Sequence, residues 1–333
     1  MNKKIDVSKS MRSIIDQSWP ADSVPLVSIS CTTYNQERYI EKCIEGFLMQ
    51  ETNFPVEILI HDDASTDATP EIIKEYQARY PDLINVILQK ENQFSKGKMV
   101  NSFNFEKARG KYVALCHGDD YWIDKRKLQK QVSVMELYDV AICGHPAREI
   151  DVEDNDLNCL TGFKVNSVSL FDSKALINNN GNMLPFGSMM ITEEAKELML
   201  KYMPPVMFHT GIQLLGASRN GLAILPDAMT AYRIAVPGST TEIMLGDNDR
   251  RLETAVKRVK SIKTLKNIYS GNERFELNRL LSKQIKTSVY LKSKINAFRI
   301  IKCMLQGESL PTKLLILSLS SFYFAKAVIG SFR

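Results

Sequence analysis

The chain has 333 residues, of which 44% are hydrophobic and 24% are charged, the composition of an ordinary folded soluble protein. No run of residues reaches the ~18 uninterrupted apolar positions that a membrane-spanning helix needs, so we expect no such span. The net charge of +5 is unevenly distributed: residues 250–333 contain 18 lysines and arginines against 4 acids, whereas residues 1–249 contain 25 against 34.

The N-terminal segment, residues 1–23, has no apolar core of signal-peptide length, so we do not expect secretion. From Val24 onward, short apolar runs alternate with helical patterns, which is typical of an α/β domain with a largely parallel sheet. Strands are predicted at 26–31, 56–61, 84–89, 111–116 and 139–145. Helices are predicted at 37–50, from the N-cap Thr69 and first-turn Pro70 onward, and after Asp124.

The remaining half of the chain has weaker patterns. Residues 150–180 are polar and rich in asparagine and aspartate, which predicts a loop or a flexible crossing segment. Further elements are expected as strands within 183–191 and 221–234, helices at 193–201 and around 210–218, and basic helices over 252–303. We therefore predict a lead segment at 1–23, one α/β domain at 24–240 with halves 24–135 and 136–240, and a basic helical extension at 241–333.

Two acidic stretches each follow a predicted strand directly. They read "HDDASTD" from His61 and "HGDDYW" from His117. In open α/β sheets, ligands bind where the carboxyl ends of the strands meet, so four acids are expected on one rim: Asp62, Asp63, Asp119 and Asp120. The first stretch taken alone also fits a helix-capping turn, but the pair of stretches favours a nucleotide bound with a divalent metal.

Three stretches together carry a family resemblance. The segments "VSISCTTYNQERYIEKCIEGFLMQ", "VEILIHDDASTDATPEII" and "ARGKYVALCHGDDYW" resemble the nucleotide-binding half of a family 2 glycosyltransferase with the GT-A fold, of the bacterial polysaccharide type. The resemblance covers about residues 24–135, with a weaker match at 184–240. It implies transfer of a sugar from a nucleotide-sugar donor, UDP-sugar first, to a glycan or lipid-linked acceptor with inversion. Mg²⁺ or Mn²⁺ would offset the charge of the leaving diphosphate.

The resemblance also implies roles for individual residues. The donor-binding residues that it implies are Thr32, Thr33 and Tyr34 along the nucleoside, Glu37 beside them, and Asp62 or Asp63 at the base or ribose. Asp119 occupies the metal-binding end of the family's Asp-x-Asp signature, and Asp120 would bind or orient beside it. His117 stands where that signature begins with an acid.

The acceptor base and the phosphate contacts are less well defined. Relatives carry a carboxylate where this chain reads "MFHTGIQLL", and the ionisable residue there is His209, whose ordinary pKa near ~6.5 suits a base. The other candidate bases are Asp227, Asp247 and Asp249. In "AYRIAVPGST", Arg233 resembles an arginine that meets the diphosphate, and Lys98 with Lys96 could steady the same charge.

Two alternative functions stay open. A nucleotidyltransferase would also place acids and metal at strand ends, but it is expected to have a glycine-rich phosphate loop, and "CTTYNQE" has no glycine. A degenerate transferase fold that binds a nucleotide or a partner without turnover is the other alternative. It is favoured by His117 and by the absence of an acid near Thr210.

The basic extension ends in an apolar segment, "LLILSLSSFYFA" at 314–325. Basic helices with an amphipathic apolar segment predict contact with an anionic membrane surface, although a solvated face is the plainer alternative. Nucleic acid is not expected, because the basic residues are not interleaved with stacking aromatics. The six cysteines lack close pairing, which favours reduced thiols, no disulfide framework or zinc site, and a cytoplasmic protein, peripheral to the inner membrane face if the extension docks there.

Overall fold

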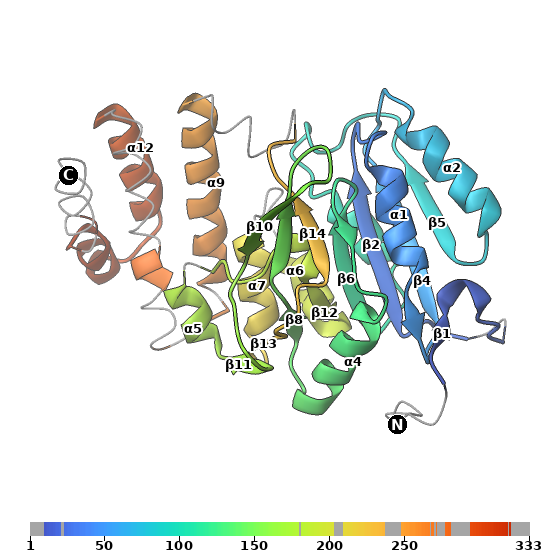
Figure 1. Ribbon diagram of the computed structural model, residues 1–333. Helices are drawn as coiled ribbons and strands as arrows, with labels where there is room; N and C mark the ends of the chain where they lie inside the picture. The colour runs from blue at the N-terminus through green and yellow to red at the C-terminus, as the bar shows by residue number, and fades with distance from the viewer. Residues whose placement is uncertain are drawn as a thin grey trace.

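The chain is built around an eight-stranded mixed sheet with the spatial order β11-β13-β8-β12-β6-β2-β4-β5 (Figure 1). The computed structural model describes residues 10–20, 23–179, 181–202, 209–236, 248–266, 268–269, 271, 277–280, 294–318 and 320. The parallel part of the sheet consists of β2 (Val27–Thr33), β4 (Val56–Asp62), β5 (Ile84–Leu88) and β6 (Tyr112–His117). These strands confirm four of the predicted ones to within two residues.

Helices cover both faces of this sheet, and the strand residues alternate between them. Ile58 and Ile60 of β4 pack with α1 (Ile40–Leu48), α2 (Thr69–Arg79) and α4 (Lys127–Tyr138). Leu59 packs on the other face with α3 (Asn101–Lys107), α6 (Glu193–Tyr202) and α7 (His209–Ala217). A parallel strand buried on both faces needs a nearly continuous apolar sequence, which explains why β2 and β4 were recognisable. The helix predicted at 37–50 is shorter, and Thr69 is the first helical residue of α2, whose N-cap is Ala68.

A second, four-stranded sheet has the order β10-β9-β14-β7. It consists of β7 (Tyr121–Trp122), β9 (Ala147–Ile150), β10 (Asp156–Thr161) and β14 (Thr230–Arg233). The prediction of a loop over 150–180 is therefore wrong, because this region also contains β11 (Ser169–Phe171) and α5 (Ser173–Asn178). The physical reason is that β10 is a short edge strand with five exposed residues out of six, and its apolar alternation at Leu157 and Cys159 breaks at Leu160, just after a shift in the register with β9.

The large sheet is completed by β11 at its edge and by three further short strands: β8 (Ile142–Gly144), β12 (Met190–Thr192) and β13 (Leu222–Ile224). β12 runs antiparallel to both of its neighbours, β6 and β8, while β13 runs parallel to β8. β8 falls inside the strand predicted at 139–145. A short two-stranded sheet of β1 (Arg12–Ser13) and β3 (Glu51–Thr52) lies beside the start of β4.

The basic extension is helical where the structure describes it. α9 (Asn248–Leu265) packs between α7 and α12 (Lys294–Leu305), and residues 310–318 are also helical (Figure 1). Ile262 of α9 and Met304 of α12 belong to the same apolar core as Leu214 of α7. Within the described part of the chain, every helix is too short or too polar to cross a membrane. The boundaries at 23/24 and 240/241 stay a prediction.

Candidate active site

The carboxyl ends of β2, β4 and β6 bring the two acidic stretches to one edge of the sheet. The parallel registers pair the last residue of β2 with Asp62 of β4, and the residue before it with His117 of β6. Just past the strands, the backbone N–H groups of Asp63 and Gly118 each donate a hydrogen bond of 3.0 Å to carbonyl oxygens of β2. The acids at 62–63 and at 119–120 therefore flank the end of β2, as predicted from the strand pattern.

The loop that follows β2 presents one open aromatic ring. Thr32 and Thr33 are buried at 6% and 4% exposure, whereas Tyr34 is 46% exposed. An exposed tyrosine ring on a fixed loop can stack on the flat face of a base. The predicted contacts of these three residues with a nucleoside are compatible with this placement and stay predictions.

Reciprocal hydrogen bonds join the loop after β2 to the loop after β4. The N–H of Asn35 donates to the Ser65 hydroxyl, and the Asn35 side-chain oxygen accepts from the N–H of Thr66, both at 2.8 Å. Asn35 adopts a positive φ of 51°, a conformation that asparagine tolerates better than most residues. Glu37 accepts a hydrogen bond from the N–H of Ala68 at 2.8 Å. The carboxylate of Glu37 thus helps to hold the loop after β2 against the loop after β4.

Asp62 and Asp63 are both buried, and each carboxylate organises its own turn. Asp62 accepts hydrogen bonds from the N–H and the hydroxyl of Ser65, while burial raises the pKa of Asp62. Asp63 accepts from the backbone N–H groups of Gln93 and Phe94, at 2.7 and 2.9 Å. A carboxylate has about four acceptor positions, so Asp62 and Asp63 keep capacity for a base or ribose in addition to these contacts.

Asp119 and Asp120 form a closely coupled carboxylate pair at the end of β6. Asp119 is half-buried, and the side chain of Gln36 hydrogen-bonds to it. Burial raises the pKa of Asp119, while the Arg233 charge and the Gln36 contact act in the opposite direction. Asp120 is 2% exposed, and burial followed by the Asp119 charge raises its pKa well above the ordinary value. Two adjacent buried acids repel unless a proton or a cation lies between them.

The polar atoms around this pair fit a bound cation. Oδ1 of Asp120 accepts the backbone N–H of Arg233 at 2.9 Å, but the buried Oδ2 has no hydrogen-bond partner among the described residues. No group of three or more histidine, cysteine, aspartate or glutamate side chains with metal-binding geometry occurs in the described ranges. The residues here that could hold Mg²⁺ or Mn²⁺ are Asp119 and Asp120, with phosphate oxygens and water as the further ligands that Mg²⁺ usually takes.

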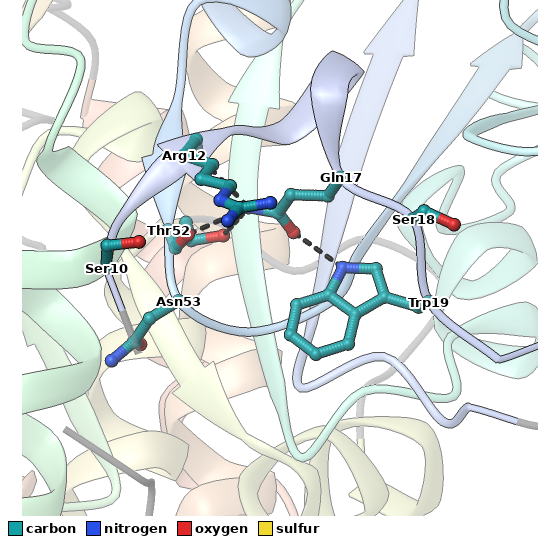
Figure 2. A pocket seen from close by; sticks show the side chains of 7 residues that line it. All are labelled: Ser10, Arg12, Gln17, Ser18, Trp19, Thr52 and Asn53. Carbon is teal, nitrogen blue, oxygen red and sulfur yellow. Dashed lines mark hydrogen bonds between the residues drawn. The ribbon is translucent and has the colours of Figure 1, made fainter. Parts of the chain in front are cut away.

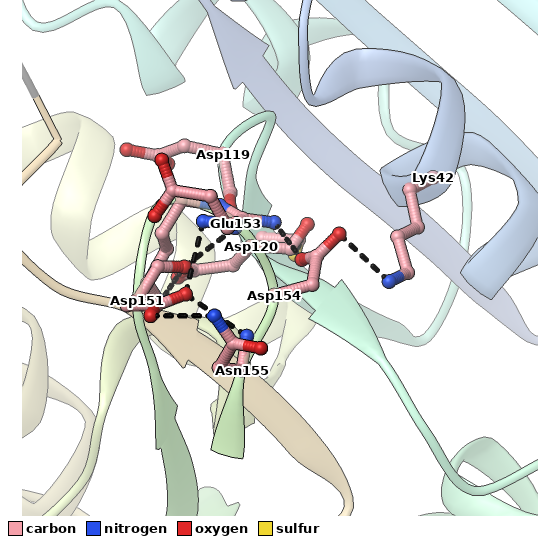
Figure 3. A network of polar contacts seen from close by, with 9 residues as sticks. Lys42, Asp119, Asp120, Asp151, Glu153, Asp154 and Asn155 are labelled. Atoms are coloured by element: carbon pink, nitrogen blue, oxygen red, sulfur yellow. Dashed lines mark hydrogen bonds and ion pairs between the residues drawn. The ribbon is translucent and has the colours of Figure 1, made fainter. Parts of the chain in front are cut away.

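Arg233 of β14 anchors the acidic turn from the side of the second sheet. It is 4% exposed, and its Nε donates to the backbone oxygen of Asp119 at 3.0 Å. Its guanidinium also donates to the Asp151 backbone oxygen and forms an ion pair with Asp154. Asp154 lies beside Asp119 and Asp120 and is bound at 2.9 Å by Lys42 of α1 (Figure 3). Arg233 thus lies at the predicted diphosphate end of the site, with its side chain engaged in holding Asp119 and the β9–β10 turn.

Two histidines and a phenylalanine form a stack beside the carboxylate pair. The His117 and Phe186 ring centroids are 3.9 Å apart, and the His209 ring lies 5.2 Å from Phe186 and 6.1 Å from His117. Burial lowers the pKa of His117 to about 4, so His117 is neutral at physiological pH. The fold therefore brings His209, the predicted acceptor base at the start of α7, close to His117, the last residue of β6.

The remaining candidates lie in different surroundings. Asp227 is 57% exposed and pairs with Lys130 at 2.8 Å. Lys96 pairs with Glu91, and Lys98 lies 5.9 Å from the ring of Phe103. Asp247 and the side chain of Asp249 lie outside the described residues. The roles proposed for these side chains stay predictions.

Several residues of this site were not predicted from the sequence. They are Gln36, Lys42, Asp154 and Phe186. Gln36 lies in the quoted "TTYNQ" turn, and its position three residues after Thr33 was an available signal. Lys42 and Asp154 are 112 positions apart, and nothing in the sequence pairs them before the fold is known.

A hollow of about 440 Å³ lies at the other end of the sheet (Figure 2). Arg12, Gln17, Trp19 and Thr52 are among its lining residues, and the Trp19 ring N–H donates to Gln17 at 2.7 Å. Thr52 precedes β4, whereas Asp62 ends it, so this hollow and the acidic rim lie at opposite ends of the same strand. The hollow takes no part in the site described above.

Comparison with known proteins gives a family match and several relatives. The family model for glycosyl transferase family 2 matches residues 28–194. An uncharacterized protein of Mycobacterium tuberculosis is 49% identical over 125 residues, which are 37% of this chain and 36% of that protein. TuaG of Bacillus subtilis, a glycosyltransferase named for teichuronic acid biosynthesis, is 37% identical over 111 residues, which are 33% and 42% of the two chains. The chain thus spans little more than a third of the length of the first relatives that it matches.

Two solved structures share the fold over most of the chain. TarS of S. aureus, residues 1–349 with UDP-GlcNAc, matches with a TM-score of 0.54 and 14% identity over 90% of this chain and 92% of that one. The mannosyltransferase PcManGT of Pyrobaculum calidifontis, with GDP-Man and Mn²⁺, matches with a TM-score of 0.51 and 17% identity over 96% and 88%. At these identities the likeness concerns the fold, which is of the GT-A type.

Proposed function

The chain belongs to glycosyl transferase family 2, and on this premise we propose that it transfers a sugar from a nucleotide-sugar donor to an acceptor hydroxyl. The observation that carries the proposal is the meeting of Asp62, Asp63, Asp119 and Asp120 at the end of β2. One end of this rim offers an exposed ring for a base, and the other offers a carboxylate pair for a metal-bound diphosphate. A UDP-sugar is the proposed donor, and a glycan or lipid-linked saccharide is the proposed acceptor.

We propose the following division of labour at the donor. Tyr34 stacks on the base, and Asp62 or Asp63 accepts hydrogen bonds from the base or ribose. Asp119 and Asp120 hold Mg²⁺ or Mn²⁺, which when bound offsets the negative charge on the departing diphosphate. Arg233 acts on these carboxylates by fixing their backbone, because three of its five N–H donors bind Asp119, Asp151 and Asp154.

The acceptor side requires a base, since an alcohol is a poor nucleophile until its proton is taken. We propose His209 for this step, because its ring lies in the stack with Phe186 and His117 next to the carboxylate pair. Removal of the hydroxyl proton by His209 would allow direct attack on the anomeric carbon and hence inversion. His117 is kept neutral by burial, so it offers no positive charge to the diphosphate.

A donor-release assay tests the proposal. The protein is incubated with a panel of UDP- and GDP-sugars and Mn²⁺, and the nucleoside diphosphate released is followed with and without saccharide acceptors. We expect release with at least one donor, its loss with EDTA, and a fall of at least about 100-fold in Asp119→Ala, the scale of one transition-state contact. Asp82→Ala is the matched control, because Asp82 is exposed at the start of β5, away from the rim.

The second candidate function is nucleotide binding without turnover. The substitution of His117 for the first acid of the signature and the absence of an acid at the start of α7 favour it. Tight, metal-independent binding of UDP, with no donor in the panel hydrolysed or transferred, would replace the transferase proposal by this one. His209→Gln separates the two further, because it should reduce transfer to an acceptor while leaving UDP binding unchanged.

A further inference from the structure

Three leucines form an exposed stripe on the helical residues 310–318. Leu310 is 69% exposed, Leu314 is 60% exposed and Leu317 is 40% exposed. Their spacing of four and three residues places them on one side of the helix. Ile316 of the same helix is fully buried and belongs to the core that also contains Met304 of α12. The helix is therefore seated on the protein by one side and presents leucines on another.

The stripe is too small for a stable protein interface. The exposed fractions of the three leucines amount to less than the surface of two whole leucine residues. A stable complex buries about 800 Å² on each partner, several times more than this. Single exposed leucines are normal on a protein surface, whereas three in a row along one helix form a narrow apolar strip, the shape that suits the interface of a bilayer.

The charge of the C-terminal region favours a bilayer as the contacting phase. Residues 250–333 contain 18 lysines and arginines against 4 acids. Lys313 directly precedes Leu314 and is half-exposed, and Lys302 of α12 is exposed. A helix with an apolar side in a basic region is the pattern of segments that lie in the headgroup layer of an anionic bilayer.

We propose that Leu310, Leu314 and Leu317 enter the headgroup layer of a bilayer that contains anionic lipid, while Lys313 and other lysines of the basic region contact the lipid headgroups. This contact is independent of the proposed sugar transfer, although it would bring the donor site to a lipid-linked acceptor. The described residues contain no helix able to span a membrane, so the contact is one of surface docking.

Vesicle flotation of the full-length chain tests this contact. Vesicles of phosphatidylcholine alone are compared with vesicles that contain about one third phosphatidylglycerol, at low salt and at high salt. We expect binding to the anionic vesicles, weaker binding at high salt, and little binding to the neutral ones, because the lysines act through a screened charge interaction.

Two variants resolve the contributions of apolar and basic groups. Leu310→Ser with Leu314→Ser should lower partitioning onto anionic vesicles by at least about tenfold, since burial of one leucine changes a partition constant by about ten- to hundredfold. Lys302→Gln with Lys313→Gln should lower it mainly at low salt. The matched control is Leu137→Ser, at a leucine that is 73% exposed on α4 and should leave partitioning unchanged.

Three outcomes would overturn the proposal. They are absence of binding to anionic vesicles by the parent chain, an equal loss in Leu137→Ser, and a concentration-dependent dimer that the double leucine variant abolishes in the absence of lipid. The last outcome would assign the stripe to a second copy of the chain. Thermal unfolding of each variant checks that the fold is kept, and donor release without lipid, followed in parallel, separates failure here from failure of the transferase proposal.

Discussion

Replacing Asp120 by asparagine is expected to stabilise the protein in the absence of metal and to weaken its response to metal. Asp120 is 2% exposed, one of its carboxylate oxygens has no described hydrogen-bond partner, and its neighbour is the carboxylate of Asp119. The Asp119 charge beside this buried carboxylate disfavours its ionised form. Asparagine keeps the acceptor for the Arg233 N–H and removes the repelled charge, while its nitrogen takes over the unpaired position. The gain therefore comes from the charge alone, and Asp120→Asn should gain about 0.5–2 kcal/mol in the free energy of unfolding in EDTA.

The order of stability should reverse when ligand is added. A ligand at 100 times its Kd stabilises the native state by ~2.7 kcal/mol. With Mn²⁺ and UDP, the parent chain should gain a stabilisation of this size and Asp120→Asn much less, as measured by urea unfolding under both conditions. Asp63→Asn is the control: both oxygens of Asp63 accept backbone N–H groups, so this change should destabilise the protein in EDTA. A loss of stability in Asp120→Asn without metal, or an unchanged response to Mn²⁺, would refute the assignment of the unpaired oxygen to a cation.

Three further changes have defined outcomes. Gly118→Ala would place a Cβ 2.5 Å from Oε1 of Gln36 and 2.8 Å from the Thr33 hydroxyl, so we expect a destabilisation of about 1–3 kcal/mol and a larger Mn²⁺ requirement for donor release. Arg233→Lys cannot reproduce the forked contacts with Asp119 and the β9–β10 turn, so urea unfolding should show a loss of about 3 kcal/mol in the free energy of unfolding. An unchanged value would contradict the anchoring role of Arg233. Burial lowers the pKa of Lys127 from 10.5 to about 7. The cost of burying its charged amine therefore lowers the free energy of unfolding fully below pH 7, and this cost disappears as the pH rises toward 10.5. Lys127→Met should be more stable than the parent at pH 6.5, by at most about 5 kcal/mol, with a smaller difference at pH 9.5.

The predictable elements of the fold are those whose own sequence determines their structure. β2, β4 and β6 are buried on both faces, so their apolar runs mark them directly, and the acids that follow them mark the carboxyl edge. Parallel neighbours end at the same edge, so one structural rule converts these local signals into a three-dimensional site. All six cysteines are free thiols, and four of them are buried.

The part that escaped prediction depends on contacts between distant segments. β10 is an exposed edge strand that is held by backbone pairing with β9, and its alternation is interrupted after Cys159, so it is too short to predict a strand. The ion pairs of Asp154 with Lys42 and Arg233 join residues that are 112 and 79 positions apart. No single segment encodes such a contact, because each partner alone reads as an ordinary surface charge.

Two opposite environments within the site explain which residues respond to ligand. Asp62 and Asp63 have their oxygens bonded to neighbouring N–H and hydroxyl groups, so their turns are complete without ligand. The carboxylate pair, by contrast, includes a buried oxygen with no described partner, and the hydroxyl of Thr33 and the side-chain oxygen of Gln36 nearby share this property. Unpaired buried oxygens cost stability, and a fold retains them where a bound group supplies the missing partner. The metal-bound diphosphate is therefore expected to provide most of the ligand-dependent stability at this end, and the nucleoside little of it.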